Sequence, residues 1–422
     1  MRLQLVSLSL GMLLGLSCSS PPVSPVKKVS LDAAAGDETS GDDASGSQGK
    51  PTDESEMDSG IGKVPDPSPP ERDDPITDPN PSPDPVKPEP KYSLLFISGG
   101  SDKIDVYKVN KSTGATALLK SNSTGGAITT FLAVNPKTNK VFGADERGNQ
   151  AIMFALDPAS GVLSEQDKLP TAGGPAHISV DAAGAQVFVA NYGAGVAESY
   201  SVTGSKLKAV SKKSPGNKAH AVHLDPSGKN LFVPCLGDGL IAHFTLDVGG
   251  SGVMTEAKTK SLSVGTKGPR HMAFHPSGKF AYLMNEYEGS VQALSLSASG
   301  LILLGGQIPS TASPVAGNTG AEISVHPNGK FLYSSNRGDD SIAIYSLAEN
   351  GTITFKKTVK TGGKTPRHFS LDESGSWLTV ANQGSDEVTF FEVNKSSGDL
   401  MLSTQRLPFK SAQFAQIVDF YE

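Results

Sequence analysis

The chain has little cysteine, only two residues among 422. Cys18 lies at the end of a predicted N-terminal leader, so Cys235 is alone in the remainder and no intramolecular disulfide is available there. Packing and closure of the fold must therefore provide the stability. Cys235 ends the strand-like run LFVPC without an obvious base beside it, and we interpret it as a small buried hydrophobe.

The folded part also lacks the excess of positive charge that nucleic-acid binding requires. The net charge of the chain is −6, whereas residues 19–91 alone carry −9, from 16 acidic and 7 basic residues. With Arg2 in the leader, residues 92–422 are left with +2 and no basic stripe. The sequence therefore predicts no nucleic-acid partner, and the acidic character belongs to the N-terminal linker.

Helical periodicity is nearly absent from residues 92–422. Strand-length apolar runs alternate with SG, NG and GG turns, and the whole chain holds 46 glycines. One hairpin-like unit, GPRHMAFHPSGKFAYLMNEYEGSV, covers 268–291. Copies of it begin at Thr129, Pro175, Lys218, Gly320 and Pro366. Units that recur at intervals of 44 to 51 residues identify a repeat fold.

The number of repeats predicts an all-β, seven-bladed β-propeller of four-stranded blades. Seven units of about 47 residues would use up 92–422. The first unit supplies only three strand-like runs, LLFIS, IDVYKV and ATALLK, whereas AQFAQIVDF stands alone near the end of the chain. We expect this last run to complete the first blade and close the ring, which removes exposed sheet edges. A six-bladed ring with a stray hairpin is the alternative.

Residues 1–18 resemble a bacterial lipoprotein signal peptide, in which the terminal cysteine, here Cys18, is lipidated. An ordinary secretory signal is the alternative. Residues 19–91 are rich in Ser, Asp and Pro, with 11 prolines among the 26 residues of 65–90, and we predict a disordered linker. The expected protein is exported and held at a membrane of the cell envelope, with the outer membrane favoured because Ser19 is not the Asp of an inner-membrane retention signal.

The repeats carry polar residues at corresponding places near the strand ends. At the place of Arg270 the copies have Thr130, Ala176, His220, Arg270, Ala321 and Arg367. Sixteen residues later they have Glu146, Tyr192, Leu236, Glu286, Arg337 and Gln383. A turn centred on Gly278 would set Arg270 opposite Glu286 in an antiparallel hairpin, and a ring would gather all such pairs at one rim. A one-residue bulge would shift any of these pairs.

A structural ion pair in a propeller that only binds ligands is the alternative to a catalytic pair. The residues at these places differ from copy to copy and include His, Arg and Glu, which favours a functional site. No metal site is predicted. His220 and His223 are three apart on a strand and should face opposite ways, and His271 and His275 should lie roughly 13 Å apart along one face.

The chain resembles the lactonase family of seven-bladed propellers, on the motifs GPRHMAFHPSGKFAYLMNE, PAHISVDAAG with VANYGAG, SSNRGDDSIAIYSL and TPRHFSLDESGSWLTVANQ. Members of this family include the bacterial propeller-type 6-phosphogluconolactonase and a fungal carboxymuconate cyclase. The resemblance extends over 92–422 and implies an active site of one His, two Arg and one Glu. By motif these are His220, Arg270, Glu286 and Arg337.

The resemblance implies hydrolysis of a small anionic sugar-acid lactone, with no metal and no organic cofactor. Such a reaction needs an activated water and stabilisation of the developing oxyanion. We assign Glu286 as the base and His220 as acid or second base, with Arg270 and Arg337 binding the anionic substrate or the oxyanion. Further substrate-binding candidates are Arg367, Glu146 and His271. A binding propeller and the lactone-forming direction are alternatives, and the substrate and oligomeric state stay open.

Overall fold

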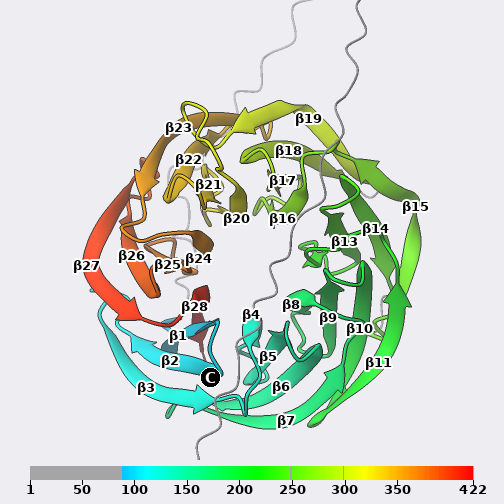
Figure 1. Ribbon diagram of the computed structural model, residues 1–422, viewed down its shortest axis with the longest axis vertical. Helices are drawn as coiled ribbons and strands as arrows, with labels where there is room; N and C mark the ends of the chain where they lie inside the picture. Colours follow the sequence, from blue (N-terminus) through cyan, green and yellow to red (C-terminus); the bar gives the residue numbers. More distant parts are fainter. Residues whose placement is uncertain (1–87, 248–249, 298, 422) are drawn as a thin grey trace, which may run out of the picture. The chain divides into compact units, whose positions relative to one another are not determined.

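The computed structural model describes residues 88–421, apart from 248–249 and 298. The predicted signal peptide and lipidation site at 1–18, and the linker as far as residue 87, lie outside the described residues. The described chain forms seven four-stranded antiparallel sheets, arranged as blades around a common axis (Figure 1). This confirms the prediction of a seven-bladed all-β propeller, and the six-bladed alternative is wrong. No helix within the described ranges has the length and apolar character needed to span a membrane.

Blade 1 contains β28 (Ala412–Phe420), β1 (Tyr92–Gly99), β2 (Lys103–Val109) and β3 (Thr116–Ser123). Blade 2 contains β4 (Thr129–Asn135), β5 (Lys140–Asp145), β6 (Gln150–Asp157) and β7 (Val162–Pro170). Blade 3 contains β8 (Pro175–Val180), β9 (Gln186–Asn191), β10 (Val196–Thr203) and β11 (Lys206–Lys213). Blade 4 contains β12 (His223–Leu224), β13 (Asn230–Cys235), β14 (Leu240–Leu246) and β15 (Met254–Ser263).

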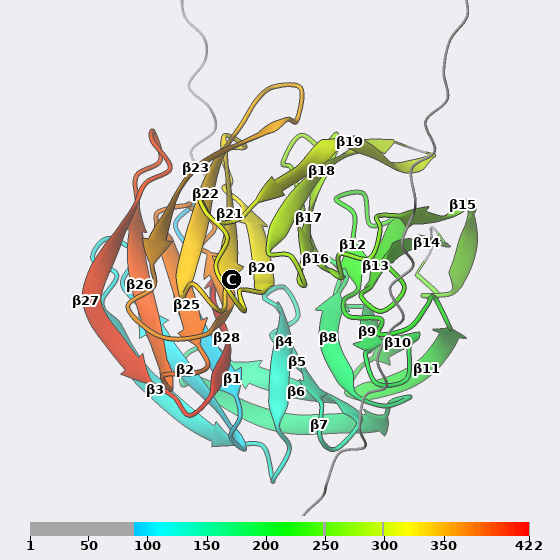
Figure 2. The same ribbon diagram turned by 45° about the horizontal axis from the view of Figure 1, so that its top comes forward.

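Blade 5 contains β16 (Pro269–Phe274), β17 (Phe280–Asn285), β18 (Ser290–Ser297) and β19 (Gly300–Pro309). Blade 6 contains β20 (Gly320–Val325), β21 (Phe331–Asn336), β22 (Ser341–Leu347) and β23 (Ile353–Lys360). Blade 7 contains β24 (Pro366–Leu371), β25 (Trp377–Asn382), β26 (Glu387–Val393) and β27 (Leu400–Pro408). The first strand of each set lies nearest the axis (Figures 1 and 2).

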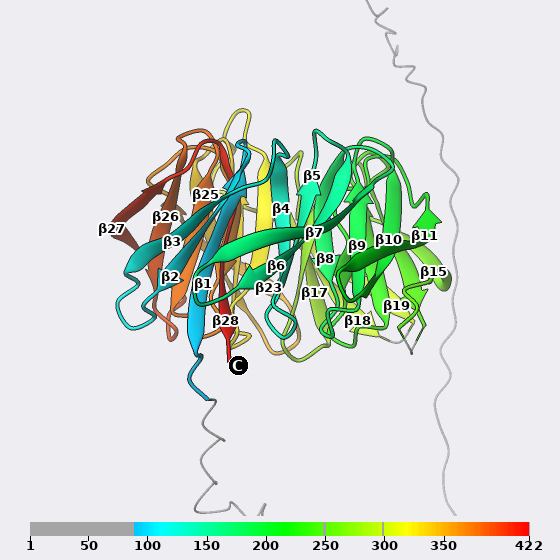
Figure 3. The same ribbon diagram turned by 90° about the horizontal axis from the view of Figure 1, so that it is seen from below.

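The C-terminal strand closes the ring as predicted. β28 pairs along its length with β1, from Tyr92 opposite Phe420 to Gly99 opposite Ala412. The described chain therefore enters and leaves the ring at the same end (Figure 3). A buried ion-pair cluster reinforces this closure, because the Lys111 ammonium lies 3.2 Å from Asp372 of blade 7 and 2.5 Å from Asp419 of β28.

The core of the described ring is divided among seven clusters of buried apolar side chains, one at each interface between neighbouring blades. The cluster between blades 7 and 1, for example, includes Trp377, Phe390 and Ile417. Cys235 is fully buried in the cluster between blades 3 and 4, where burial raises the pKa of its thiol to about 12. This confirms the interpretation of Cys235 as a small hydrophobic side chain.

The inner hairpins of blades 3, 4 and 7 turn tightly around an Asp at a fixed place. In the turn of blade 4, Asp225 Oδ1 accepts hydrogen bonds from the N–H groups of Lys229 and Asn230. Gly228 adopts a φ of +67°, a left-handed conformation that favours glycine. These turns lie at the end of the ring where the chain enters. The opposite end, where the inner strands begin, is called the rim below.

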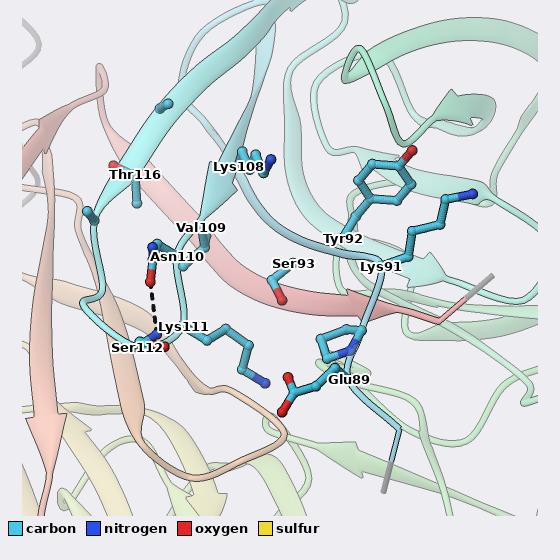
Figure 4. Close-up of a pocket in the computed structure, with 13 residues that line it drawn as sticks. Glu89, Lys91, Tyr92, Ser93, Lys108, Val109, Asn110, Lys111, Ser112 and Thr116 are labelled. Carbon is cyan, nitrogen blue, oxygen red and sulfur yellow. Dashed lines mark hydrogen bonds between the residues drawn. The ribbon is translucent and has the colours of Figure 1, made fainter.

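A hollow of about 460 Å³ marks the end of the ring where the chain enters (Figure 4). It is bordered by the entering segment at Glu89–Ser93 and by the β2–β3 connection, which includes Lys111. The hollow is open, and Lys111 is engaged with Asp372 and Asp419. We interpret this hollow as a by-product of ring closure. The candidate functional site lies at the rim, at the opposite end of the ring.

Candidate functional site at the rim of the propeller

The inner strand of every repeat copy carries a bulge where it reaches the rim. In β16, Pro269 pairs with Asn285 and His271 pairs with Met284, which leaves Arg270 as the extra residue. The bulges of blades 2, 3 and 7 hold Thr130, Ala176 and Arg367, and those of blades 4 and 6 span 220–222 and 321–322. A bulge turns side chains away from the regular alternation of a strand. The bulge therefore sets where these side chains point.

The bulge corrects the predicted hairpin register. Arg270 is not opposite Glu286, because the Glu286 N–H donates to the carbonyl of Gly268 at 2.7 Å. The predicted register assumes a regular hairpin, which cannot accommodate the extra residue of β16. The other predicted pairs are displaced in the same way. The side chains nevertheless meet, since the bulge turns Arg270 toward the end of β17.

Glu286 is held between two guanidinium groups from neighbouring blades. Its Oε2 lies 3.1 Å from Nε of Arg270, and its Oε1 lies 3.0 Å from Nη2 of Arg337. The same arginines donate to backbone carbonyls of β20: Arg270 Nη1 to Ala321 at 2.6 Å, and Arg337 Nη2 to Gly320 at 3.0 Å. These contacts fix the orientation of the carboxylate and of both arginines. Three of the four predicted catalytic residues therefore form one bridge between blades 5 and 6.

The rim holds more positive charge than this bridge neutralises. Burial and the neighbouring Arg367 lower the pKa of Arg270 to about 9, so that Arg270 stays charged at pH 7. Arg367 makes no ion pair or hydrogen bond with any residue that the structure describes. Burial and the nearby charge of Arg337 lower the pKa of Arg367, and the charges of Glu146 and Glu286 oppose this shift. Arg367 is thus a half-buried cation without a direct partner.

Three histidines near the axis connect neighbouring blades. Each ring accepts a hydrogen bond from a buried backbone N–H of an adjacent blade, and such groups need a partner. The pairs are His177 with Val222 at 3.4 Å, His223 with Met272 at 3.1 Å, and His368 with Ala415 at 3.3 Å. Accepting requires a neutral ring. Burial keeps the rings neutral, because burial lowers the pKa of His223 and of His368 to about 4 and the pKa of His177 well below 6.5.

His271 and His220 use their ring nitrogens differently. His271 donates from Nδ1 to the buried carboxylate of Glu322, with both oxygens at 3.0 Å, while its Nε2 is buried without a partner among the described residues. His220 is 5% exposed, and its Nδ1 is likewise buried and unpartnered there. The two ring centroids are 5.1 Å apart. His271, predicted to bind substrate, therefore lies beneath the rim.

The predicted orientation of His220 and His223 is wrong. Their rings were expected to face opposite ways, yet the centroids lie 5.1 and 5.6 Å from that of His271. The reason is the bulge at 220–222, which breaks the alternation of the strand. In the described part of the chain, no group of three or more His, Cys, Asp or Glu side chains is arranged to hold a metal ion.

A cavity of about 10 Å³ lies between the rim arginines and the buried histidines, which is room for about one water molecule. It is lined by Thr130, Phe131, Ala176, Arg270, His271, Glu322, Arg367, His368 and Gln413. These residues come from six blades, so the closed ring is needed to form the cavity. Glu322 was missed at the sequence level. It follows Ala321 at the place where three other copies carry His177, His271 and His368, and a carboxylate among histidines is the signal that could have identified it.

Lys218 was also missed at the sequence level. Its ammonium lies 5.8 Å from the ring centroid of Tyr192 and donates to the hydroxyl of Tyr287 at 3.4 Å. Lys218 has a φ of +54°, at a place where blades 3 and 5 have Gly174 and Gly268, which also have positive φ. The left-handed conformation costs a lysine about 1–2 kcal/mol. Lys218 therefore holds its side chain in this position despite an unfavourable backbone conformation.

Comparisons with known proteins agree with this architecture. The family model "Lactonase, 7-bladed beta-propeller" matches residues 93–417. The chain is 28% identical over 317 residues to a 6-phosphogluconolactonase of Serratia proteamaculans, covering 74% of this chain and 94% of that protein. A 6-phosphogluconolactonase of Erwinia tasmaniensis is 29% identical over 323 residues, covering 73% of this chain and 93% of that protein.

Solved structures share the fold. A protein from Bacteroides uniformis superposes with a TM-score of 0.70 at 25% identity, covering 77% of this chain and 99% of that one. The periplasmic gluconolactonase of Pseudomonas aeruginosa superposes with a TM-score of 0.70 at 24% identity, covering 78% and 99%. With a family match over most of the ring, this chain belongs to the seven-bladed β-propeller lactonase family.

Proposed function

We propose that the protein opens a small anionic sugar-acid lactone at the rim, using a water molecule activated by Glu286. Membership of the lactonase family makes the chain a lactonase-type hydrolase. The finer assignment of the substrate is supported by the name that the curated relatives carry, 6-phosphogluconolactonase. It is also supported by the charge of the site.

The proposal rests mainly on the arrangement of three arginines around one carboxylate. Arg270 and Arg337 hold Glu286 from two sides, and Arg367 stands beside them without a direct partner. A cation of this kind can pair with the anionic group of a substrate, for which the rigid guanidinium fork is well suited. The scaffold of the bridge consists of strand ends and buried bulges, so the charges are placed before the substrate arrives.

In this proposal Glu286 takes the proton of the attacking water while the water oxygen bonds to the lactone carbonyl carbon. Arg270 stabilises the negative charge that develops on the carbonyl oxygen, and Arg337 and Arg367 bind the anionic group of the substrate. His220 is neutral at pH 7, because burial and the charge of Arg270 hold its pKa well below 6.5. It can therefore receive the proton from Glu286 and return it to the alkoxide when the ring C–O bond breaks.

A binding propeller without catalysis is the second candidate. Both Glu286 oxygens are engaged in ion pairs, and both arginines also donate to backbone carbonyls, as they would in a purely structural bridge. The two candidates differ in one outcome. A catalytic carboxylate is needed for turnover, whereas a structural one is needed for folding or ligand binding.

Replacement of Glu286 by Gln tests the catalytic assignment. The amide keeps the shape and removes the base, so we expect kcat on a panel of sugar-acid lactones to fall by about 10²–10⁴. Arg337→Ala should chiefly raise KM, since it removes a group that binds the anion. Gln383→Ala is the control, because Gln383 occupies the corresponding place in blade 7. Equal rates for the wild type and Glu286→Gln, with folding checked by thermal melting, would exclude Glu286 as the base.

We also propose that the protein is exported and anchored by a lipid on Cys18, with 19–91 as its tether and the outer membrane as the favoured site. The leader motif supports this proposal. The described ring begins at the end opposite the rim, so an anchor on this tether would leave the rim accessible (Figure 3).

A further inference from the structure

Five histidines lie together near the axis, and two of them keep a ring nitrogen free. His177, His223 and His368 each spend a nitrogen on a backbone N–H of an adjacent blade. His271 and His220 accept no such bond. Nε2 of His271 and Nδ1 of His220 are both buried and unpartnered among the described residues, on rings 5.1 Å apart. Burying a polar group without a partner costs free energy, so the two free nitrogens call for an explanation.

The protonation of His271 follows from Glu322. The carboxylate accepts from Nδ1 of His271 with both oxygens at 3.0 Å, and it also accepts the N–H of Ile323 at 3.0 Å. A carboxylate has no proton to donate, so the proton of neutral His271 lies on Nδ1. Nε2 of His271 then carries no proton and presents a lone pair. Nδ1 of His220, the other unpartnered nitrogen, lies on a ring whose centroid is 5.1 Å from that of His271. The two nitrogens do not bond to each other in the structure, so pairing them requires the rings to turn toward each other.

We propose that Glu322, His271 and His220 form a proton relay, in which Glu322 and His271 fix the tautomer of His220 and stabilise its imidazolium during turnover. His220 then carries its own proton on Nδ1 and presents Nε2 as an acceptor to the rim. The inference rests on the proposed lactone hydrolysis and adds two positioning residues, Glu322 and His271, that do not touch the substrate.

The proton balance closes over one turnover. The O–H bond of water breaks as its oxygen bonds to the carbonyl carbon, and the proton passes through Glu286 to Nε2 of His220. The resulting imidazolium donates from Nδ1 to Nε2 of His271, and the negative charge of Glu322 offsets it through the Nδ1–H of His271. When the ring C–O bond breaks, Nε2 of His220 gives the proton to the alkoxide oxygen. All three side chains are then in their starting forms.

The surroundings of the relay suit this role. The charged and titratable groups that act on the two rings are Arg270, Arg367, His177, His223, His368 and Glu322. Burial, together with the charge of the arginines, keeps both histidines neutral at rest, since these effects hold the pKa of each well below 6.5. Glu322 is the one buried carboxylate among these groups, so it is the source of charge compensation when His220 is protonated. The water-sized cavity beside His271 and Arg270 leaves space for the rings to adjust.

Glu322→Gln is the informative variant, because the amide oxygen can still accept from His271 while the charge is lost. We expect kcat to fall by about 10²-fold with KM nearly unchanged. The acidic limb of the kcat profile should move to lower pH, since the imidazolium of His220 loses its stabilising charge. His223→Gln is the matched control, because it keeps an acceptor for the N–H of Met272 and its ring centroid lies 5.6 Å from that of His271. It should leave the profile in place.

Nitrogen-15 NMR of the imidazole rings tests the relay without any substrate. In the wild type, His271 and His220 should both be in the Nδ1–H form, and Glu322→Gln should weaken this preference in His271, because an amide can donate to Nδ1 as well as accept from it. A proton on Nε2 of His220, or a kcat profile that Glu322→Gln and His223→Gln shift equally, would overturn the relay. If the wild type opens no lactone but shows the expected tautomers, the proposed function fails while the ordering of protons by Glu322 stands.

Discussion

At the scale of the residue, the same chemical group serves two purposes around the axis. His177, His223 and His368 hold the ring together by accepting backbone N–H groups, which only an unprotonated imidazole can do. His271 is oriented by Glu322 and leaves a nitrogen free. His368 combines both environments, since its Nδ1 accepts the N–H of Ala415 and its Nε2 lies 3.7 Å from Glu322 Oε2. The use of each histidine therefore depends on which groups the adjacent blades offer it.

The buried histidines predict a loss of stability in mild acid. Burial lowers the pKa of His223 and of His368 from 6.5 to about 4, so the unfolded chain binds more protons than the native protein between these values. The free energy of unfolding should fall as pH drops from 6.5 toward 4, by at most about 3 kcal/mol for each of these two groups. Urea unfolding at a series of pH values measures this.

A variant separates the histidine contribution from that of the carboxylates. His223→Gln removes one titrating ring and keeps its acceptor function, so the free energy of unfolding should depend less steeply on pH between 6.5 and 4. His275→Gln is the control, because His275 lies in a partly buried turn outside the cluster at the axis, where its ring contacts Ser277 and the carbonyl of Gly329. A slope for His223→Gln equal to that of the wild type would contradict the role of burial.

The residues of the site were predictable where they follow the repeat, and their geometry was not. Comparison of the copies predicted that Arg270, Glu286 and Arg337 meet at one rim, because they occupy corresponding places in the repeat and those places differ from copy to copy. It failed on the register, since a bulge adds one residue without any change in composition that marks it. The contact of Glu322 with His271 joins blades 5 and 6, and no spacing within one repeat encodes a contact of that kind.

At the scale of the element, the last strand decides whether the ring exists. β28 pairs with β1 and places Phe414 and Phe420 in the cluster between blades 1 and 2. It also brings Gln413 to the cavity beneath the rim. Strand lengths, turns and closure were predictable from the sequence, because each depends on local patterns and on counting repeats.

Removal of 412–422 should therefore unfold the whole ring, because it exposes the edge of β1 and opens two clusters at once. A milder test is Phe414→Ala, which should lower the free energy of unfolding by about 3–5 kcal/mol, since the ring of Phe414 is 1% exposed. Met401→Ala on the outer strand β27 is the control, because Met401 is 63% exposed and should change stability by less than about 0.5 kcal/mol. A truncated protein with the melting curve of the full chain would disprove closure by β28.

At the scale of the whole molecule, the two ends of the ring have different roles. The inner strands β16 and β24 bring Arg270 and Arg367 to the rim, and the end of β21 brings Arg337 there. The chain enters at the opposite end, beside Glu89 and Lys111 (Figures 3 and 4). The candidate site and the point where the described chain enters the ring therefore lie at opposite ends of the propeller.

The lipid anchor provides the last prediction. If Cys18 is lipidated, Cys18→Ser should move the protein from the membrane fraction to the soluble fraction of the cell. Its lactonase activity per molecule should be unchanged, because the rim is formed by residues of the ring alone. Cys235→Ala is the control, since Cys235 is buried between blades 3 and 4 and its replacement should leave the protein with the membranes. Fractionation of both variants, followed by immunoblotting, decides the matter. A Cys18→Ser protein that stays in the membrane fraction would show that Cys18 is not the anchor.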